Sequence, residues 1–149
     1  MAGLTDLAGQ RVGLDTVIFI YALEGNPKLG RAALEVFSQL EGGLFRGYAC
    51  DLVLAELIVQ PLRLGRDEIV TEYLQELPRF PHLNFCHLTQ AVVIEAGRLR
   101  GRYSVGLADA LHLEATRSAG CTVFLTNDQA LSQVESGLRI LQLQELSLP

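Results

Sequence analysis

Apolar stretches of strand length alternate along this chain with longer stretches whose apolar residues recur at helical spacing. This alternation is typical of an α/β domain, and we predict a three-layer α/β/α fold around a mainly parallel central sheet. The strands are predicted at residues 11–14, 45–50, 83–88, 121–125 and 138–143. The helices are predicted at residues 16–24, 29–40, 52–64, 66–77, 89–103 and 107–118, with one or two helical turns at 129–134.

Particular residues mark where some of these elements begin and end. The helix at 16–24 is apolar nearly all round, which predicts a buried helix, and the Gly-Asn-Pro run at 25–27 ends it. Asp51 is predicted to cap the helix at 52–64 with its side chain. Pro61 interrupts the apolar pattern of that helix and predicts a kink or the start of a new helix.

The length and composition indicate one globular domain. The chain has 149 residues, of which 49% are apolar and 19% are charged. A chain of this length buries a full core without metals or disulfides, so we expect a single domain over residues 1–149 with its core at about 12–143. No apolar run is long enough to cross a membrane, and the N-terminal residues lack a secretory pattern. We therefore expect a cytoplasmic protein that does not enter a membrane.

Charge and cysteine content narrow the possibilities further. The formal net charge is −5, which is not the balance of a typical nucleic-acid binder. The three cysteines form no CxxC pair, and each lies in or beside a predicted strand. We expect these cysteines to be reduced and buried.

Acidic residues follow two of the predicted strands. Asp15 comes directly after the strand at 11–14, and Asp128 comes shortly after the strand at 121–125. Because ligands of parallel α/β sheets bind beyond the carboxyl ends of the strands, we expect both carboxylates at the same edge of the sheet. A third acid, Asp109, lies near the start of a helix whose other face is apolar.

Glu56 is an acid in the middle of an otherwise apolar helical stretch. A carboxylate with Val53, Leu54 and Leu57 as neighbours is costly to bury without a partner. The residue alone leaves three interpretations open. It pairs with an arginine, it lies at the exposed edge of its helix, or it joins other carboxylates around a cation.

The four acids together favour a shared cation. Four carboxylates that converge in a medium of low dielectric repel one another and raise one another's pKa. A hard divalent cation removes this repulsion, and Mg²⁺ or Mn²⁺ suits a set of carboxylate ligands. Such sites hydrolyse phosphodiesters. Neither the single lysine nor the cysteines, nor any serine–histidine pair, offers a competing chemistry.

The four acids lie in three segments of distinctive sequence. These are LDTVIFIYALEGNP with Asp15, LVLAELIVQPLRLG with Glu56, and LADALHLEATRSAGCTVFLTND with Asp109 and Asp128. In order, spacing and context the segments resemble the PIN-domain ribonucleases, and among them the VapC-like toxins of prokaryotic toxin–antitoxin pairs. The likeness runs from about Val12 to Leu143, and the last segment is the most specific.

This resemblance implies a PIN-like fold and a metal-dependent endoribonuclease in which the four acids bind one or two Mg²⁺ or Mn²⁺ ions. It also implies that water, rather than a side chain, attacks the phosphodiester, and that Thr126 orients a carboxylate or that water. The implied partners are an RNA substrate, a small antitoxin protein and a second copy of the chain. Val17 departs from the family pattern, because many members have Asn or Ser there. This departure affects the expected rate rather than the expected activity.

Other polar residues have both a functional and a structural interpretation. His112 shares a helix face with Asp109. One interpretation makes it a metal ligand or a general base. The interpretation that we expect is a histidine that holds the local structure. Asn127 either assists the metal site or makes the turn. Glu24 and Glu114 are expected at the surface.

Three arginines precede Asp109 and also have two interpretations. In the first, they contact RNA phosphates beside the metal site. In the second, they form a solvated helix end, where positive side chains interact favourably with the helix dipole. These residues are Arg98, Arg100 and Arg102.

Other functions compete with the nuclease. A receiver-type signalling domain needs a lysine late in its sheet, but the only lysine is Lys28, in a predicted loop. A haloacid-dehalogenase-like phosphatase needs a second Asp where Val17 stands. The remaining alternative is a catalytically weak or inactive PIN-like module that binds RNA or a protein, and the retention of all four acids argues against it.

Overall fold

A five-stranded sheet forms the centre of the computed structural model, which describes residues 3–146. The strand order is β3-β2-β1-β4-β5, and every neighbouring pair is parallel. The predicted parallel sheet is therefore confirmed. The strands are β1 (Arg11–Leu14), β2 (Arg46–Cys50), β3 (Leu83–Cys86), β4 (Val123–Thr126) and β5 (Arg139–Gln142).

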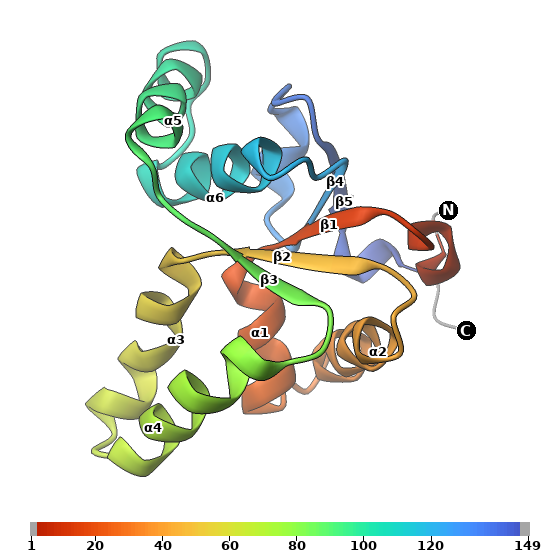
Figure 1. Ribbon diagram of the computed structural model, residues 1–149, viewed down its shortest axis with the longest axis vertical. Helices are drawn as coiled ribbons and strands as arrows, with labels where there is room; N and C mark the ends of the chain where they lie inside the picture. Colours follow the sequence, from red (N-terminus) through yellow and green to blue (C-terminus); the bar gives the residue numbers. More distant parts are fainter. Residues whose placement is uncertain (1–2, 147–149) are drawn as a thin grey trace.

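Helices cover both faces of the sheet and complete the three predicted layers (Figure 1). One side carries α1 (Thr16–Glu24), α2 (Gly30–Glu41), α3 (Leu52–Arg63) and α4 (Asp67–Glu76). The other side carries α5 (Gln90–Arg102) and α6 (Leu107–Ser118). Short 3₁₀ helices occupy Leu4–Leu7 (η1), Leu77–Arg79 (η2), Gln129–Gln133 (η3) and Leu143–Glu145 (η4). Within residues 3–146, every helix is too short or too polar to cross a membrane.

The apolar core lies on both faces of the sheet. On one face, Leu14 and Phe19 belong to a cluster that joins β1 to α1 and α2. On the other face, Phe124 of β4 packs with Leu99 and Leu113 under α5 and α6. Burial of these large apolar side chains on both faces drives the three layers together. The three cysteines are free and buried, as predicted.

Helix α6 packs closely over β1 because residue 13 is glycine. A Cβ atom at Gly13 would lie 2.8 Å from Cβ of Thr116 on α6 and 2.8 Å from Cδ1 of Phe124. Carbon atoms in contact are normally about 3.5–4.0 Å apart, so a larger residue would push the helix away from the sheet. Gly13 therefore sets how closely α6 approaches the end of β1.

Two predictions about helices need correction. Helix α3 passes through Pro61 and ends at Arg63, so no new helix starts at the proline, and the kink stays a prediction. Because Pro61 stands in the last turn, its missing N–H removes little of the helix. Helix α1 is only partly buried: Phe19 is covered, but Leu23 is 43% exposed.

Two acids also lie elsewhere than predicted. Asp51 makes no side-chain cap for α3; its Oδ2 instead lies 2.8 Å from Nδ1 of His87. Glu114 is buried rather than at the surface, and its Oε2 lies 2.7 Å from Nη2 of Arg117. The arginine, one helical turn later, compensates the burial of the glutamate charge. Glu24 is exposed, as predicted.

Candidate active site

A cavity of about 510 Å³ lies at the carboxyl ends of β1 and β4. The topology explains its position, because β1 and β4 are neighbouring parallel strands whose ends meet at one edge of the sheet. The four acids come from the end of β1, from α3, from α6 and from the segment after β4. All four sequence-predicted acids line the cavity: Asp15, Glu56, Asp109 and Asp128. The rest of the lining consists of Thr16, Val17, Ile20, Tyr21, Val59 and Asn127.

Asp15 is the most deeply buried of these acids, at 8% exposure. Its Oδ1 accepts a hydrogen bond from the backbone N–H of Thr16 at 2.8 Å, and its Oδ2 accepts one from Oγ1 of Thr126 at 2.7 Å. Burial raises the pKa of Asp15, while these hydrogen bonds lower it, and the net shift is upward. The carboxylate is therefore held firmly in a place where its charge is disfavoured.

Thr126 connects the two strand ends of the cavity. Besides donating to Asp15, its fully buried Oγ1 accepts a hydrogen bond from the backbone N–H of Asp128 at 3.1 Å. Asp128 is exposed, and its Oδ1 accepts a hydrogen bond from the backbone N–H of Ala130 at 3.0 Å at the start of η3. The contact with Asp15 supports the predicted role of Thr126 in orienting a carboxylate.

Glu56 has polar partners from two other elements. Its Oε1 accepts a hydrogen bond from Oγ1 of Thr16 at 2.7 Å and lies 2.6 Å from Nε2 of His112. The hydrogen bond with His112 lowers the pKa of Glu56, and burial acts in the opposite direction. Within residues 3–146 no arginine pairs with Glu56, and its side chain is 40% exposed. Glu56 thus lies both at the helix edge and beside other polar residues of the cavity.

His112 belongs to this group, although the sequence favours a purely local role for it. Its side chain is 2% exposed. Burial lowers the pKa of the ring, but the neighbouring Cys50 and Glu56 side chains and the charge of Asp15 raise it, to about 10. The ring is therefore cationic at neutral pH. Thr16 is also missed by sequence reasoning; its only signal is that it directly follows Asp15.

Asp109 carries the clearest sign of repulsion between the acids. Burial raises its pKa, and the negative charges of Asp15 and Asp128 raise it further. The charge of His112 acts in the opposite direction, but within the described part of the chain no hydrogen bond to the carboxylate lowers its pKa. Its charge is consequently compensated less than that of Asp15 or Glu56.

The oxygen atoms that line the cavity are of the type that binds a hard cation. Carboxylate oxygens are preferred ligands of Mg²⁺ and Mn²⁺. Asn127 adds an amide oxygen: its Nδ2 donates to the Tyr21 hydroxyl at 3.2 Å, while its buried Oδ1 has no hydrogen-bond partner within residues 3–146. In the same residues, no three His, Cys, Asp or Glu side chains lie close enough together to hold a metal ion.

The predicted RNA-binding arginines lie outside this cavity, on the exposed surface of α5. Nε of Arg98 lies 3.2 Å from Oε1 of Glu95 on the same helix. Nε of Arg100 donates to the backbone carbonyl of Val105 at 3.2 Å, and Arg102 ends the helix. These contacts fit a solvated helix end, and RNA contact by the three arginines stays a prediction.

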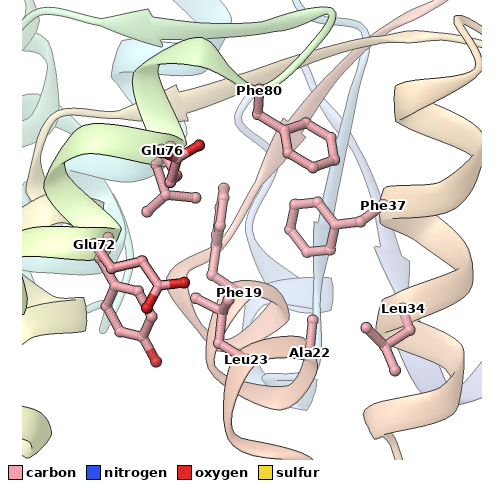
Figure 2. Close-up of a pocket in the computed structure, with 10 residues that line it drawn as sticks. Phe19, Ala22, Leu23, Leu34, Phe37, Glu72, Glu76 and Phe80 are labelled. Carbon is pink, nitrogen blue, oxygen red and sulfur yellow. The ribbon is translucent and has the colours of Figure 1, made fainter. Parts of the chain in front are cut away.

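A second cavity, of about 230 Å³, lies between α1, α2 and α4 and is largely apolar (Figure 2). The rings of Phe19 and Phe37 pack at 5.0 Å between centroids, and those of Phe37 and Phe80 at 5.7 Å. Glu72 and Glu76 stand on the α4 side (Figure 2). Helix α1 lines both cavities, with different residues facing each.

Residues 12–137 match the PIN domain family. The chain belongs to the PIN domain family. This match covers most of the chain and confirms the family resemblance of the three acidic segments. Proteins with a PIN domain are typically nucleases. Val17 adds an apolar side chain to the cavity wall.

Several solved structures share the fold of this PIN domain. VapBC2 from Rickettsia felis, bound to a DNA fragment from its promoter, is 18% identical with a TM-score of 0.70, over 89% of this chain and 98% of that one. DNA-bound VapBC from Salmonella typhimurium is 20% identical with a TM-score of 0.69, over 90% and 98% of the two chains. FitAcB from Neisseria gonorrhoeae is 14% identical with a TM-score of 0.70, over 91% and 99%. Among curated proteins, none matches the sequence.

Proposed function

We propose that this PIN domain is a divalent-metal-dependent endoribonuclease that hydrolyses RNA phosphodiester bonds. The observation that carries the proposal is the convergence of Asp15, Glu56, Asp109 and Asp128 on one cavity from four separate elements. The raised pKa of Asp15 and of Asp109 supports it, because carboxylates that resist ionisation in the folded protein gain from a nearby cation.

The four acids would hold one or two Mg²⁺ or Mn²⁺ ions, which supply positive charge to the scissile phosphate and lower the pKa of the attacking water. Thr126 holds Asp15 through Oδ2, and Thr16 holds Glu56 through Oε1. These two hydrogen bonds orient the carboxylates before RNA binds. Cationic His112 balances the charge of Glu56, which leaves the excess negative charge on the three aspartates.

An RNA cleavage assay with Mg²⁺ or Mn²⁺ tests this function. Asp109→Asn should lower the cleavage rate at least about 100-fold, because it removes a ligand charge from the cavity. Asp67→Asn, at an exposed acid on α4, is the matched control and should retain full activity. Undiminished cleavage by Asp109→Asn, or by the wild type in excess chelator, would overturn the proposed function.

A catalytically weak or inactive module that binds RNA or a protein is the second candidate. It is favoured by the spacing of the acids, since within residues 3–146 no three potential ligands lie close enough to hold an ion. Titration calorimetry with Mn²⁺ separates the two candidates. We expect a heat of binding that Asp109→Asn abolishes; no heat with the wild type would favour the binding module.

The proposed protein partner is a small antitoxin. The similar structures from Klebsiella pneumoniae and Rickettsia felis are described as a toxin–antitoxin complex and as VapBC2 bound to promoter DNA. We propose that the antitoxin docks in the apolar cavity between α1, α2 and α4. Its docking segment should present apolar side chains to Leu23 and Phe37 and a basic side chain to Glu72 and Glu76 (Figure 2).

A binding assay with the protein encoded by a short upstream reading frame tests the antitoxin. Leu34→Arg, at the 56% exposed rim of the apolar cavity, should weaken binding at least about 10-fold by placing a like charge against the basic side chain. Leu64→Arg, at a 59% exposed position outside the cavity, is the matched control. Equal binding by both variants would place the antitoxin elsewhere.

We also propose that the protein forms a homodimer and that it acts in the cytoplasm. Val93 and Ile94 are neighbouring apolar residues on α5 that are 47% and 51% exposed, and they offer a surface for a second copy. The three free cysteines suit a reducing compartment. Light scattering measures the oligomeric state; a monomer at all concentrations would contradict the dimer.

A further inference from the structure

Glu56, Thr16 and His112 make one mutual contact, which we name the Glu56 node. Oε1 of Glu56 lies 2.7 Å from Oγ1 of Thr16 and 2.6 Å from Nε2 of His112, and those two atoms are 3.3 Å apart. We propose that His112 is a positioning residue for Glu56: with Thr16 it holds Oε1 and leaves Oε2 for a cation in the cavity. The inference rests on the proposed function, since the cation is the one that the nuclease requires.

Glu56 needs such an anchor because its own helix does not fix its side chain. At 40% exposure, a glutamate without partners samples several rotamers and loses that freedom when it binds a ligand. Two donors on the same oxygen restrict the carboxylate to one orientation. Within residues 3–146 no protein group donates to the other oxygen, Oε2.

His112 is suited to act as the anchor. Its buried ring belongs to α6, and that helix is seated firmly on β1 at Gly13. The same helix carries Asp109 one turn earlier, on the same face. Helix α6 therefore presents Asp109 directly and positions Glu56 through His112. Thr16 follows Asp15 directly, so the Glu56 node also contacts the chain at the end of β1.

The contacts of His112 distinguish this role from ordinary core packing. Nδ1 of the ring is buried without a hydrogen-bond partner within residues 3–146. Its Nε2 contacts Glu56 and Thr16, and both of these residues line the cavity. The ring thus contacts two residues of the site through Nε2, while the buried Cys50 side chain is its polar neighbour in the core.

Titration of the metal-free protein with Mn²⁺ measures this role. His112→Leu keeps an apolar side chain in the core but removes the donor, and we expect Mn²⁺ affinity to fall about 10- to 100-fold. His112→Gln restores an N–H donor and should recover most of the affinity. His87→Leu, which removes a histidine from the exposed contact with Asp51, is the matched control and should bind Mn²⁺ like the wild type. If His112→Leu does not fold, Thr16→Val removes the second donor and serves the same comparison.

Thermal unfolding of the metal-free variants provides a second readout. His112→Leu should lower the Tm of the wild type but have little further effect when Glu56→Ala is already present, because the contact is then gone. If His112→Leu changes the Tm equally in the wild type and in Glu56→Ala, the contact between His112 and Glu56 does not exist and the proposal is overturned. Mn²⁺ affinity that His112→Leu leaves intact overturns only the positioning role, whereas a wild type that binds no Mn²⁺ overturns the proposed function itself.

Discussion

The four acids of the cavity differ in how the protein compensates their charge. Asp15 is buried and has two hydrogen-bond donors, and half-exposed Glu56 has a hydroxyl and a cationic ring. Asp109 has no protein donor within the described residues and lies near two other negative charges. The uncompensated charge in the metal-free protein is therefore greatest at Asp109.

Asp109→Asn should stabilise the metal-free protein. The substitution keeps the shape of the side chain and removes the repulsion from Asp15 and Asp128, so we expect the Tm to rise by a few degrees. Calorimetry in the presence of a chelator measures this change. Asp67→Asn, in the first turn of α4, should leave the Tm unchanged or slightly lower, because an acid there favours the helix dipole. A lower Tm for Asp109→Asn would show that repulsion does not dominate at this position.

Thr126→Val should destabilise the protein although the two side chains have nearly the same shape. The variant removes a donor from buried Asp15 and leaves the backbone N–H of Asp128 without its acceptor. We expect the free energy of unfolding to fall by about 1–3 kcal/mol. Urea unfolding provides the measurement, and Thr122→Val, at an exposed hydroxyl, should change it by less than about 0.5 kcal/mol. Equal effects of the two variants would show that the hydrogen bonds of Thr126 do not contribute to stability more than an exposed hydroxyl does.

At the scale of elements, α6 and α1 position most of the cavity. Helix α6 carries Asp109 and His112, and its distance from the sheet depends on Gly13. Helix α1 separates the acidic cavity from the apolar cavity and lines both. Its apolar residues on all sides therefore reflect two cavities and not complete burial.

Gly13→Ala should displace α6 and destabilise the fold. The added methyl group would overlap Thr116 and Phe124, and overpacking of this kind costs about 1–3 kcal/mol. Chemical denaturation measures this cost, and Mn²⁺ affinity should fall with it because Asp109 moves. Gly97→Ala on α5 has open space around the new methyl group and should stabilise the protein by about 0.5–1 kcal/mol. A Gly13→Ala protein as stable as the wild type would show that α6 tolerates a larger separation.

At the scale of the whole molecule, buried protonated groups link stability to pH. The pKa of His112 is raised to about 10 from its usual 6.5, and burial raises the pKa of Cys86 and of Cys121 to about 12 from 9. The folded protein thus keeps protons that the unfolded chain releases, so its stability falls as pH rises. The His112 contribution is complete below pH 6.5 and is lost by about pH 10, with a slope of up to about 1.4 kcal/mol per pH unit.

Urea unfolding of the metal-free protein between about pH 6.5 and about pH 9 measures this dependence. His112→Gln, which does not titrate, should flatten the curve over this range. A free energy of unfolding that stays constant or rises with pH in the wild type would contradict the raised pKa of His112.

The sheet and the cavity are both predictable from the sequence because they follow from local patterns. Alternation of strand-length and helix-length apolar stretches reflects which faces are buried, and it predicts the parallel sheet. Parallel strands end at one edge, so the sequence places Asp15 and Asp128 at the same edge of the sheet. That β1 and β4 are neighbours, which brings both acids to one cavity, comes from the structure.

Pairings between distant residues are not predictable in the same way. Glu56 and His112 are 56 positions apart, on helices that cover opposite faces of the sheet. Asp51 contacts His87 instead of capping α3 for a similar reason. No periodicity in the sequence encodes such a contact, because it depends on how helices of different layers meet at the sheet edge.

The sequence by itself determined the layered fold, through its local periodicity, and indicated the family and the four acids, through the resemblance of three acidic segments. Only the tertiary structure decided how each acid is held: Asp15 by Thr126, Glu56 by Thr16 and His112, and Asp109 by no protein donor in the described chain. The physical reason is that hydrogen bonds act over about 3 Å, so they depend on the final packing of side chains.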